Sequence, residues 1–213
     1  MTARAERHLR AIKLAKDCAE LGARIRSIHW ITGLPARELQ RLLFNDPHAI
    51  PRGRAPDSPE WYHTANLLFR ADASVFAAVY RRVRAAGFGA GEALVGAYRH
   101  YTVVSQAPHR ISFDRAFDLA AHMDGIWIAR TASFAVVACP FCASEFMAAL
   151  GASPAANDCP FCKLMRRYRK DPRIQTAFPA LPLPDPATLL SAVTPLYGAG
   201  RDGGDAETEH SSS

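Results

Sequence analysis

Cys139-Pro-Phe-Cys142, followed after 16 residues by Cys159-Pro-Phe-Cys162, is the part of the sequence that most restricts how the chain can fold. A Cys-x-x-Cys turn directs two sulfur atoms toward one centre, and two such turns complete a tetrahedron of thiolates with metal–sulfur distances of about 2.3 Å. The spacing is typical of a four-cysteine zinc site. Because every ligand is a thiolate, no position stays open for water, so we expect one structural Zn2+ per chain. The predicted ligands are Cys139, Cys142, Cys159 and Cys162.

Other interpretations of the two cysteine pairs stay open at the level of the sequence. A rubredoxin-type iron centre uses similar pairs of turns. Thioredoxin-like redox chemistry needs one pair that opens a helix after a strand, so two identical pairs disfavour it. The four cysteines could also be free thiols. The fifth cysteine, Cys18, falls on or beside the apolar face of an expected N-terminal helix, and we expect it to be a small core residue.

Short β-prone segments flank the first cysteine pair. Residues 126–128 (Ile-Trp-Ile) and 133–138 (SFAVVA) precede it, and residues 144–150 could return as a partner strand. A β-rich module of this size buries too little apolar surface to fold alone, so the bound metal is expected to supply the missing stability.

Upstream of residue 125, the apolar residues recur at three- and four-residue steps, which predicts helices. The expected helices cover about residues 4–21, 23–31, 35–44, 61–86, 92–102 and 113–123. The second and third are joined through Gly33 and form a helix-turn-helix pattern. Its expected buried positions are Ile28, Leu34, Leu39 and Leu42. His29 departs from this pattern, because a small residue usually stands there to let the two helices approach.

The predicted fold class is therefore mainly α: a helical N-terminal domain with a helix-turn-helix-like element, plus a small four-cysteine zinc-ribbon-like β module. Three domains are expected. Residues 1–125 would form a helical DNA- or partner-binding domain, and residues 126–173 the zinc-binding module with a basic extension. Residues 174–213 are a Pro-rich acidic tail in which prolines first alternate with apolar residues. Its end, GAGRDGGDAETEHSSS (residues 198–213), cannot form a core, and we expect the tail to be disordered.

Charge is distributed unevenly along the 213 residues. Residues 1–173 carry a net charge of +10 and residues 174–213 a net charge of −4, and 22 of the 26 cations are arginines. An arginine-rich surface favours a polyanionic partner, although a high-GC genome would produce the same excess of Arg over Lys.

Several functional classes lack their sequence signals. No stretch approaches the ~18 apolar residues of a membrane span, and the N-terminus has no apolar core of a secretory signal. No glycine-rich loop lies in the strand–turn–helix context that binds phosphates, and histidines and carboxylates show no arrangement typical of an active site. We therefore expect a cytoplasmic protein that is not an enzyme and has no membrane partner.

Three groups of polar side chains could contact DNA. The second helix of the helix-turn-helix would present outward-facing Arg and Gln, which can read guanine and adenine edges in the major groove. A Pro-rich connector and the run after the last cysteine add cations for phosphates. The predicted DNA-binding residues are Arg37, Gln40, Arg41, Arg52, Arg54, Arg166, Arg167, Arg169 and Lys170. The same residues could instead form solvated surfaces.

The order of these parts resembles a known family. LGARIRSIHWITGLPARELQRL (residues 21–42) is followed by a Pro-rich connector that reaches Trp61, by SVFAAVYRRVRAAGFGAGEALVGAYRHY (residues 74–101) and by the two cysteine pairs. Across roughly residues 5–170 the chain resembles FlhC, the C subunit of the bacterial flagellar master transcriptional activator. The connector PRGRAPDSPEWY (residues 51–62) and the tail after Pro172 depart from the family pattern, which indicates a divergent member.

The resemblance implies a function and a set of partners. In that family the four cysteines bind structural zinc, and the C subunit binds promoter DNA in a complex of four D and two C subunits. The complex activates flagellar class II operons through the housekeeping-sigma form of RNA polymerase. The alternative function is a zinc-containing protein-interaction adaptor or anti-activator that makes no direct contact with DNA.

Overall fold

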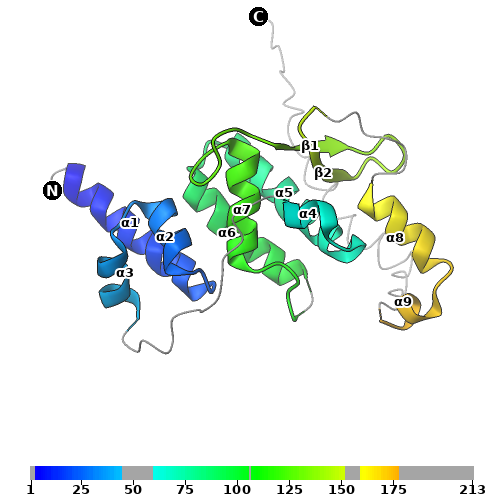
Figure 1. Ribbon diagram of the computed structural model, residues 1–213, viewed down its shortest axis with the longest axis horizontal. Helices are drawn as coiled ribbons and strands as arrows, with labels where there is room; N and C mark the ends of the chain where they lie inside the picture. The colour runs from blue at the N-terminus through cyan, green and yellow to red at the C-terminus, as the bar shows by residue number, and fades with distance from the viewer. Residues whose placement is uncertain (1–2, 45–59, 106, 152–158, 178–213) are drawn as a thin grey trace, which may run out of the picture. The chain divides into compact units, whose positions relative to one another are not determined.

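The computed structural model describes residues 3–44, 60–105, 107–151 and 159–177 (Figure 1). The chain divides into two compact units, residues 1–170 and 171–213. The second unit contributes one described element, the short helix α9 (Pro172–Ala177). The described part is mainly helical with one two-stranded sheet, which confirms the predicted fold class. The expected domain limits at residues 125 and 173 stay a prediction.

All other described elements belong to the first unit. In chain order they are α1 (Ala3–Glu20), α2 (Ile25–Thr32), α3 (Ala36–Leu43), α4 (Glu60–Thr64), α5 (Leu67–Ala85), α6 (Ala90–Val104), α7 (Phe113–Asp124), β1 (Phe134–Ala138), β2 (Glu145–Ala149) and α8 (Pro160–Tyr168). Figure 1 shows α5, α6 and α7 in the middle of this unit, with α1–α3 on one side and the β1–β2 hairpin and α8 on the other.

The helices α2 and α3 form the expected helix-turn-helix-like pair. Gly33 follows α2 in the left-handed region, with φ of 73°, and its N–H donates to the His29 carbonyl, so that the chain turns sharply into α3. Three of the four residues expected inside, those at positions 28, 34 and 39, are buried. Leu42 was expected to be buried and is 45% exposed, because Leu43 is the residue of this last turn that packs on the core.

His29 does not prevent the close approach of α2 and α3. Its side chain is exposed, and its Nδ1 lies 2.8 Å from the Leu34 carbonyl oxygen. The ring therefore lies along the outside of the turn between the two helices, where it helps to hold the turn. A small residue is not required at this position as long as the imidazole points away from the helix contact.

A buried carboxylate joins the helix-turn-helix to α7. Asp114 is 2% exposed, and its Oδ1 accepts hydrogen bonds from the Arg24 N–H at 3.2 Å and the Ser27 hydroxyl at 2.5 Å. Its Oδ2 pairs with the Arg24 guanidinium at 2.5 Å. Since the residue before α2 has no side-chain cap of its own, Asp114 supplies the negative group that the N-terminus of α2 favours.

The sequence predicted one helix from Trp61 onward, whereas the structure has two. The short α4 ends at Thr64, and α5 begins after Asn66, whose Oδ1 accepts a hydrogen bond from the Phe69 N–H at 3.1 Å. An N-capping asparagine starts a new helix because it satisfies one of the first N–H groups. The break directs Tyr62 of α4 into the core, where it is 2% exposed.

The segment Ile126–Ile128, predicted to be β-prone, forms a turn after α7. Gly125 ends the helix in the left-handed region, and the Ile126 N–H donates to the Ala121 carbonyl at 3.1 Å. The Trp127 ring stacks on Phe117, with 5.1 Å between ring centroids. The apolar residues of this segment therefore cap a helix and cover its face, and no strand is formed.

The two predicted strands at residues 133–138 and 144–150 are confirmed as the antiparallel β1–β2 hairpin, in which Val136 pairs with Met147 and Val137 with Phe146. Because side chains alternate along a strand, the hairpin has two different faces. Val136 and Met147 pack with the core of the helical body, whereas Val137 and Phe146 pack around the cysteines. The hairpin thus connects the cysteine cluster to the helices.

Candidate metal centre and nucleic-acid interface

The four predicted metal ligands come together at one end of the hairpin. Cys139 follows the last residue of β1, and Cys142 lies in the same turn before β2. Cys159 precedes the first residue of α8, and Cys162 lies in its first turn. The Sγ atoms of Cys139 and Cys162 are 3.7 Å apart, those of Cys142 and Cys159 are also 3.7 Å apart, and all four lie within 4.8 Å of one another.

These distances fit a tetrahedral metal site. A metal ion with four sulfur ligands at about 2.3 Å requires sulfur–sulfur separations of about 3.8 Å. A disulfide would need about 2.05 Å, and the four cysteines are free thiols. The sulfur atoms are therefore placed to hold one metal ion, and this geometry suits zinc and a rubredoxin-type iron equally.

The turn that carries the first pair is held by backbone hydrogen bonds. The Phe141 N–H donates to the Cys139 Sγ at 3.4 Å, the Ala143 N–H donates to the Cys139 carbonyl at 2.9 Å, and the Cys139 N–H donates to the Ser144 carbonyl at 3.0 Å. Ala143 has a φ of 57°, in the left-handed region that a residue with a Cβ rarely adopts. The chain accepts this conformation in order to close the turn around the sulfur atoms.

The second pair differs from the first, because it opens a helix. Cys159 stands at the N-cap of α8 and Pro160 occupies the first helical position, where proline is tolerated. The sequence predicted two similar turns, and the helical geometry of the second pair differs from that prediction. A helix-opening pair alone would suit redox chemistry, but here both of its sulfur atoms lie within 4.8 Å of the first pair.

The thiols of the cluster have unequal acidities. Hydrogen bonds from the side chain and the backbone of Ser144 lower the pKa of Cys142 to about 6. A hydrogen bond with Cys142 raises the pKa of Cys162 to about 12, and burial raises the pKa of Cys159. One thiolate therefore disfavours the ionisation of its neighbours. A cation at the centre would remove this penalty, since it favours the thiolate form of every ligand.

The cluster is fixed to α4 and α5 through β2. The Tyr62 hydroxyl donates to the Met147 carbonyl at 2.6 Å, and the Met147 N–H donates to the Ser74 hydroxyl oxygen at 3.2 Å. At the start of β2, Glu145 pairs with Arg81 and Arg82 of α5. The metal centre is therefore held on the helical body by hydrogen bonds to both backbone groups of one residue and by an ion-pair cluster.

Cys18 lies apart from the four-cysteine cluster. It is fully buried in the main core, and burial raises the pKa of its thiol to about 12. The prediction that Cys18 is a small core residue is confirmed.

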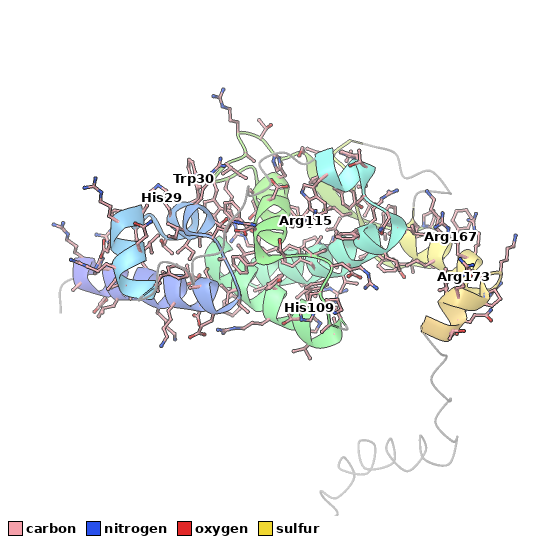
Figure 2. The ribbon with its side chains drawn as sticks, turned by 60° about the horizontal axis from the view of Figure 1, so that its bottom comes forward. His29, Trp30, His109, Arg115, Arg167 and Arg173 are labelled. Atoms are coloured by element: carbon pink, nitrogen blue, oxygen red, sulfur yellow. The ribbon has the colours of Figure 1, made fainter. Side chains whose placement is uncertain are left out.

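The predicted DNA-binding residues lie on two separate surfaces. Arg37, Gln40 and Arg41 are exposed together on α3. The second group is exposed on α8 and directly after it, and Figure 2 labels Arg167 on this helix. Its members are Arg166, Arg167, Arg169 and Lys170. The structure does not bring the two groups together, and Arg52 and Arg54 lie outside the described residues.

A comparison with models of protein families shows which family this chain belongs to. The model of the flagellar transcriptional activator family, FlhC, matches residues 4–175, which include the helix-turn-helix and all four clustered cysteines. The chain belongs to the FlhC family. A search among curated proteins found no match. This match confirms the resemblance that the sequence indicated. FlhC proteins are transcriptional regulators of flagellar genes and not a family of enzymes.

In this FlhC-family chain, sequence reasoning missed a basic groove beside the helix-turn-helix. A groove of about 640 Å³ lies between the first half of α1 and the turn after α2, and it is lined by Arg4, Arg7, His8, Thr32 and Leu34 among others. The signal was present as cations three residues apart on one face of α1. In the part of this FlhC-family chain that the structure describes, no helix is long and apolar enough to cross a membrane.

Proposed function

We propose that this FlhC-family chain is a DNA-binding subunit of a flagellar transcriptional activator that works in the cytoplasm. It would act on class II flagellar operons with a D-type partner subunit, in a complex of four D and two C subunits, and with RNA polymerase. Membership of the family over residues 4–175 is the observation that carries this proposal. The exposed polar side chains on α3 support direct contact with DNA.

In this proposal α3 reads the base sequence. Arg37, Gln40 and Arg41 are exposed on a helix that follows a sharp glycine turn, as in helices that enter the major groove. Arginine pairs with guanine edges and glutamine with adenine edges. Arg4 and Arg7 line the groove beside the same turn, where they would bind phosphates next to the bases that α3 reads.

The zinc module supplies a second contact with the duplex. One Zn2+ held by the four cysteines would fix the start of α8, so that Arg166, Arg167, Arg169 and Lys170 keep a constant position against the phosphate backbone. Arg52 and Arg54 would add further phosphate contacts. We propose zinc and not iron because structural zinc is commonly held in closed sites with four cysteine ligands.

A second candidate function is a zinc-containing adaptor or anti-activator that binds protein without DNA. Trp30 and Leu42 favour it, because they are 44% and 45% exposed on α2 and α3. Large apolar side chains on a surface suit a protein partner. In the DNA-binding proposal the same two residues would face the D-type subunit, so both functions predict a protein contact and only one predicts a DNA contact.

Fluorescence anisotropy with a labelled class II promoter fragment separates the two functions. The full chain is titrated into the fragment with and without the D-type subunit, over a range of salt concentrations. Gln40→Ala should weaken binding to the promoter by roughly 5- to 150-fold, the cost of losing one specific base contact of about 1–3 kcal/mol. Neutralising Arg166, Arg167 and Arg169 together should flatten the log–log salt dependence by ~2–3, because each phosphate contact contributes about 0.9.

Lys13→Ala is the matched control, since Lys13 is an exposed cation of α1 that does not line the basic groove. It should leave the promoter affinity within about two-fold of the wild type, as expected for a charge outside the footprint. Capture of the D-type subunit without any binding to the promoter, at low salt and with the complex assembled, would establish the adaptor function instead.

A further inference from the structure

The tetrapeptide Cys-Pro-Phe-Cys occurs twice, and its two phenylalanines have different environments. Phe161, in α8, is half-buried and packs with Phe146 in the small core around the cysteines. Phe141, in the turn between β1 and β2, is 67% exposed. The same four residues therefore place one aromatic ring inside the module and the other in solvent, so packing of the module accounts for Phe161 only.

The exposed ring stands on a rigid part of the chain. The Phe141 N–H donates to the sulfur of Cys139, and the turn around it is closed by the two backbone hydrogen bonds between Cys139 and residues 143 and 144. Both flanking cysteines belong to the metal cluster. A ring on such a turn loses little backbone freedom when a partner covers it, which favours its use in binding.

The part of the sequence that carries Phe141 and the metal cluster is basic. Between residues 134 and 170 the sequence has five cations and only two acidic residues, and one of these, Glu145, pairs with Arg81 and Arg82. Arg167 and Met165 are exposed on α8, which starts at the cysteine cluster, and Met165 adds a second apolar side chain that is 57% exposed. A partner of this module needs a high density of negative charge together with accessible apolar surface.

Duplex DNA has both properties. It carries one phosphate charge per about 1.7 Å of its axis, and its stacked bases accept apolar side chains such as Phe and Met at individual steps. An acidic protein with an apolar pocket is the competing partner, and the test below distinguishes it from DNA. We propose that Phe141 is an apolar DNA contact of the zinc module, whose ring inserts at a base step while the cations of α8 bind the adjacent phosphates. This inference rests on the DNA-binding function proposed above.

The test uses the full chain with its D-type subunit and a promoter fragment that carries 2-aminopurine at successive positions. With the wild type, fluorescence should rise at one position, because the ring unstacks the probe there. Phe141→Ala should abolish this rise and weaken binding by roughly ten-fold, the order found for loss of one base–aromatic contact. The salt dependence should not change, since no charge is removed. Phe141→Trp should restore both affinity and the fluorescence signal.

Phe88→Ala is the matched control, because Phe88 is also exposed, at 56%, and follows α5 far along the chain from the cysteines. It should bind like the wild type. Metal content of Phe141→Ala is measured in parallel and should stay at one ion per chain.

If the wild type binds the promoter and Phe141→Ala binds equally well, the inference is wrong while the DNA-binding function stands. If Phe141→Ala instead fails to capture the D-type subunit, the ring is a protein contact and the inference is equally overturned. If the wild type does not bind DNA, both fail.

Discussion

The N–H of Met147 in β2 donates a hydrogen bond to the hydroxyl oxygen of Ser74 in α5, across 3.2 Å. Both residues are fully buried, and the Ser74 hydroxyl in turn donates to the Arg70 carbonyl of its own helix at 2.7 Å. A small side chain of a long helix thus takes the place that a third strand would have next to β2. At Met147 the helical body therefore supplies both backbone hydrogen bonds that a further strand would supply, since the Tyr62 hydroxyl donates to its carbonyl.

Ser74→Ala should lower the free energy of unfolding by about 1–3 kcal/mol, because the Met147 N–H is left buried without its acceptor. Urea unfolding followed by circular dichroism measures the change. Thr102→Ala is the matched control, since the Thr102 hydroxyl donates to the Arg99 carbonyl of its own helix and lies at the surface. A loss of stability in the control as large as that in Ser74→Ala would show that the bond to β2 is not responsible.

Asp114→Ala should destabilise the chain by about 3 kcal/mol, as expected when one partner of a buried, hydrogen-bonded ion pair is removed. The loss should appear first as faster amide exchange in α2, because Asp114 binds the N-terminal end of that helix. Asp17→Ala removes the exposed pair with Arg99 and should cost at most about 1 kcal/mol. Equal costs for the two variants would contradict a special role for the buried carboxylate.

Removal of the metal should loosen the hairpin and α8 while the central helices stay folded. Elemental analysis is expected to find one zinc per chain in the wild type and in Cys18→Ala, and none in Cys162→Ser, because only the latter removes a clustered sulfur. Hydrogen exchange after chelation should show lost protection in β2 and retained protection in α6. Full metal content in Cys162→Ser would mean that three sulfurs suffice or that the ion lies elsewhere.

Ala143→Gly should stabilise the metal-bound protein by about 1 kcal/mol, because glycine adopts a φ of 57° without the penalty that a Cβ incurs. Thermal unfolding of the zinc-loaded chain is the measurement. Ala138→Gly, a matched substitution in β1, should have the opposite sign, since glycine weakens a strand. A lower midpoint for Ala143→Gly would indicate that the Ala143 methyl group makes contacts worth more than the relief of strain.

Much of the fold follows from local chemistry that the sequence displays. A glycine between two segments with helical periodicity predicts that one helix ends and the next begins there. Gly33 does end α2, and α3 follows it. The cysteine spacing likewise predicts the four sulfur atoms that the structure brings together. In both cases a few residues close in sequence, or a ligand geometry with one solution, determine the outcome.

Other features depend on contacts between distant residues. Trp127 belongs to a β-prone tripeptide, yet its ring stacks on Phe117 and the segment becomes a turn. The start of α5 at Asn66 is a local exception, because an asparagine before an apolar run is a capping signal that the sequence displays. The helical form of the second cysteine pair does not follow from its tetrapeptide, because the same Cys-Pro-Phe-Cys forms a turn between β1 and β2, and the two pairs differ only in the residues that surround them.

The alternation of side chains in the β1–β2 hairpin limits how this region can change in length. Insertion or deletion of one residue in either strand would turn every following side chain to the opposite side. In β2, Met147 would leave the helical body and Phe146 would leave the sulfur atoms in a single step. In β1, Val136 and Val137 would exchange sides in the same way, so two interiors would fail together. A point substitution can alter one interior at a time. A single-codon insertion or deletion should not be tolerated in β1 or in β2.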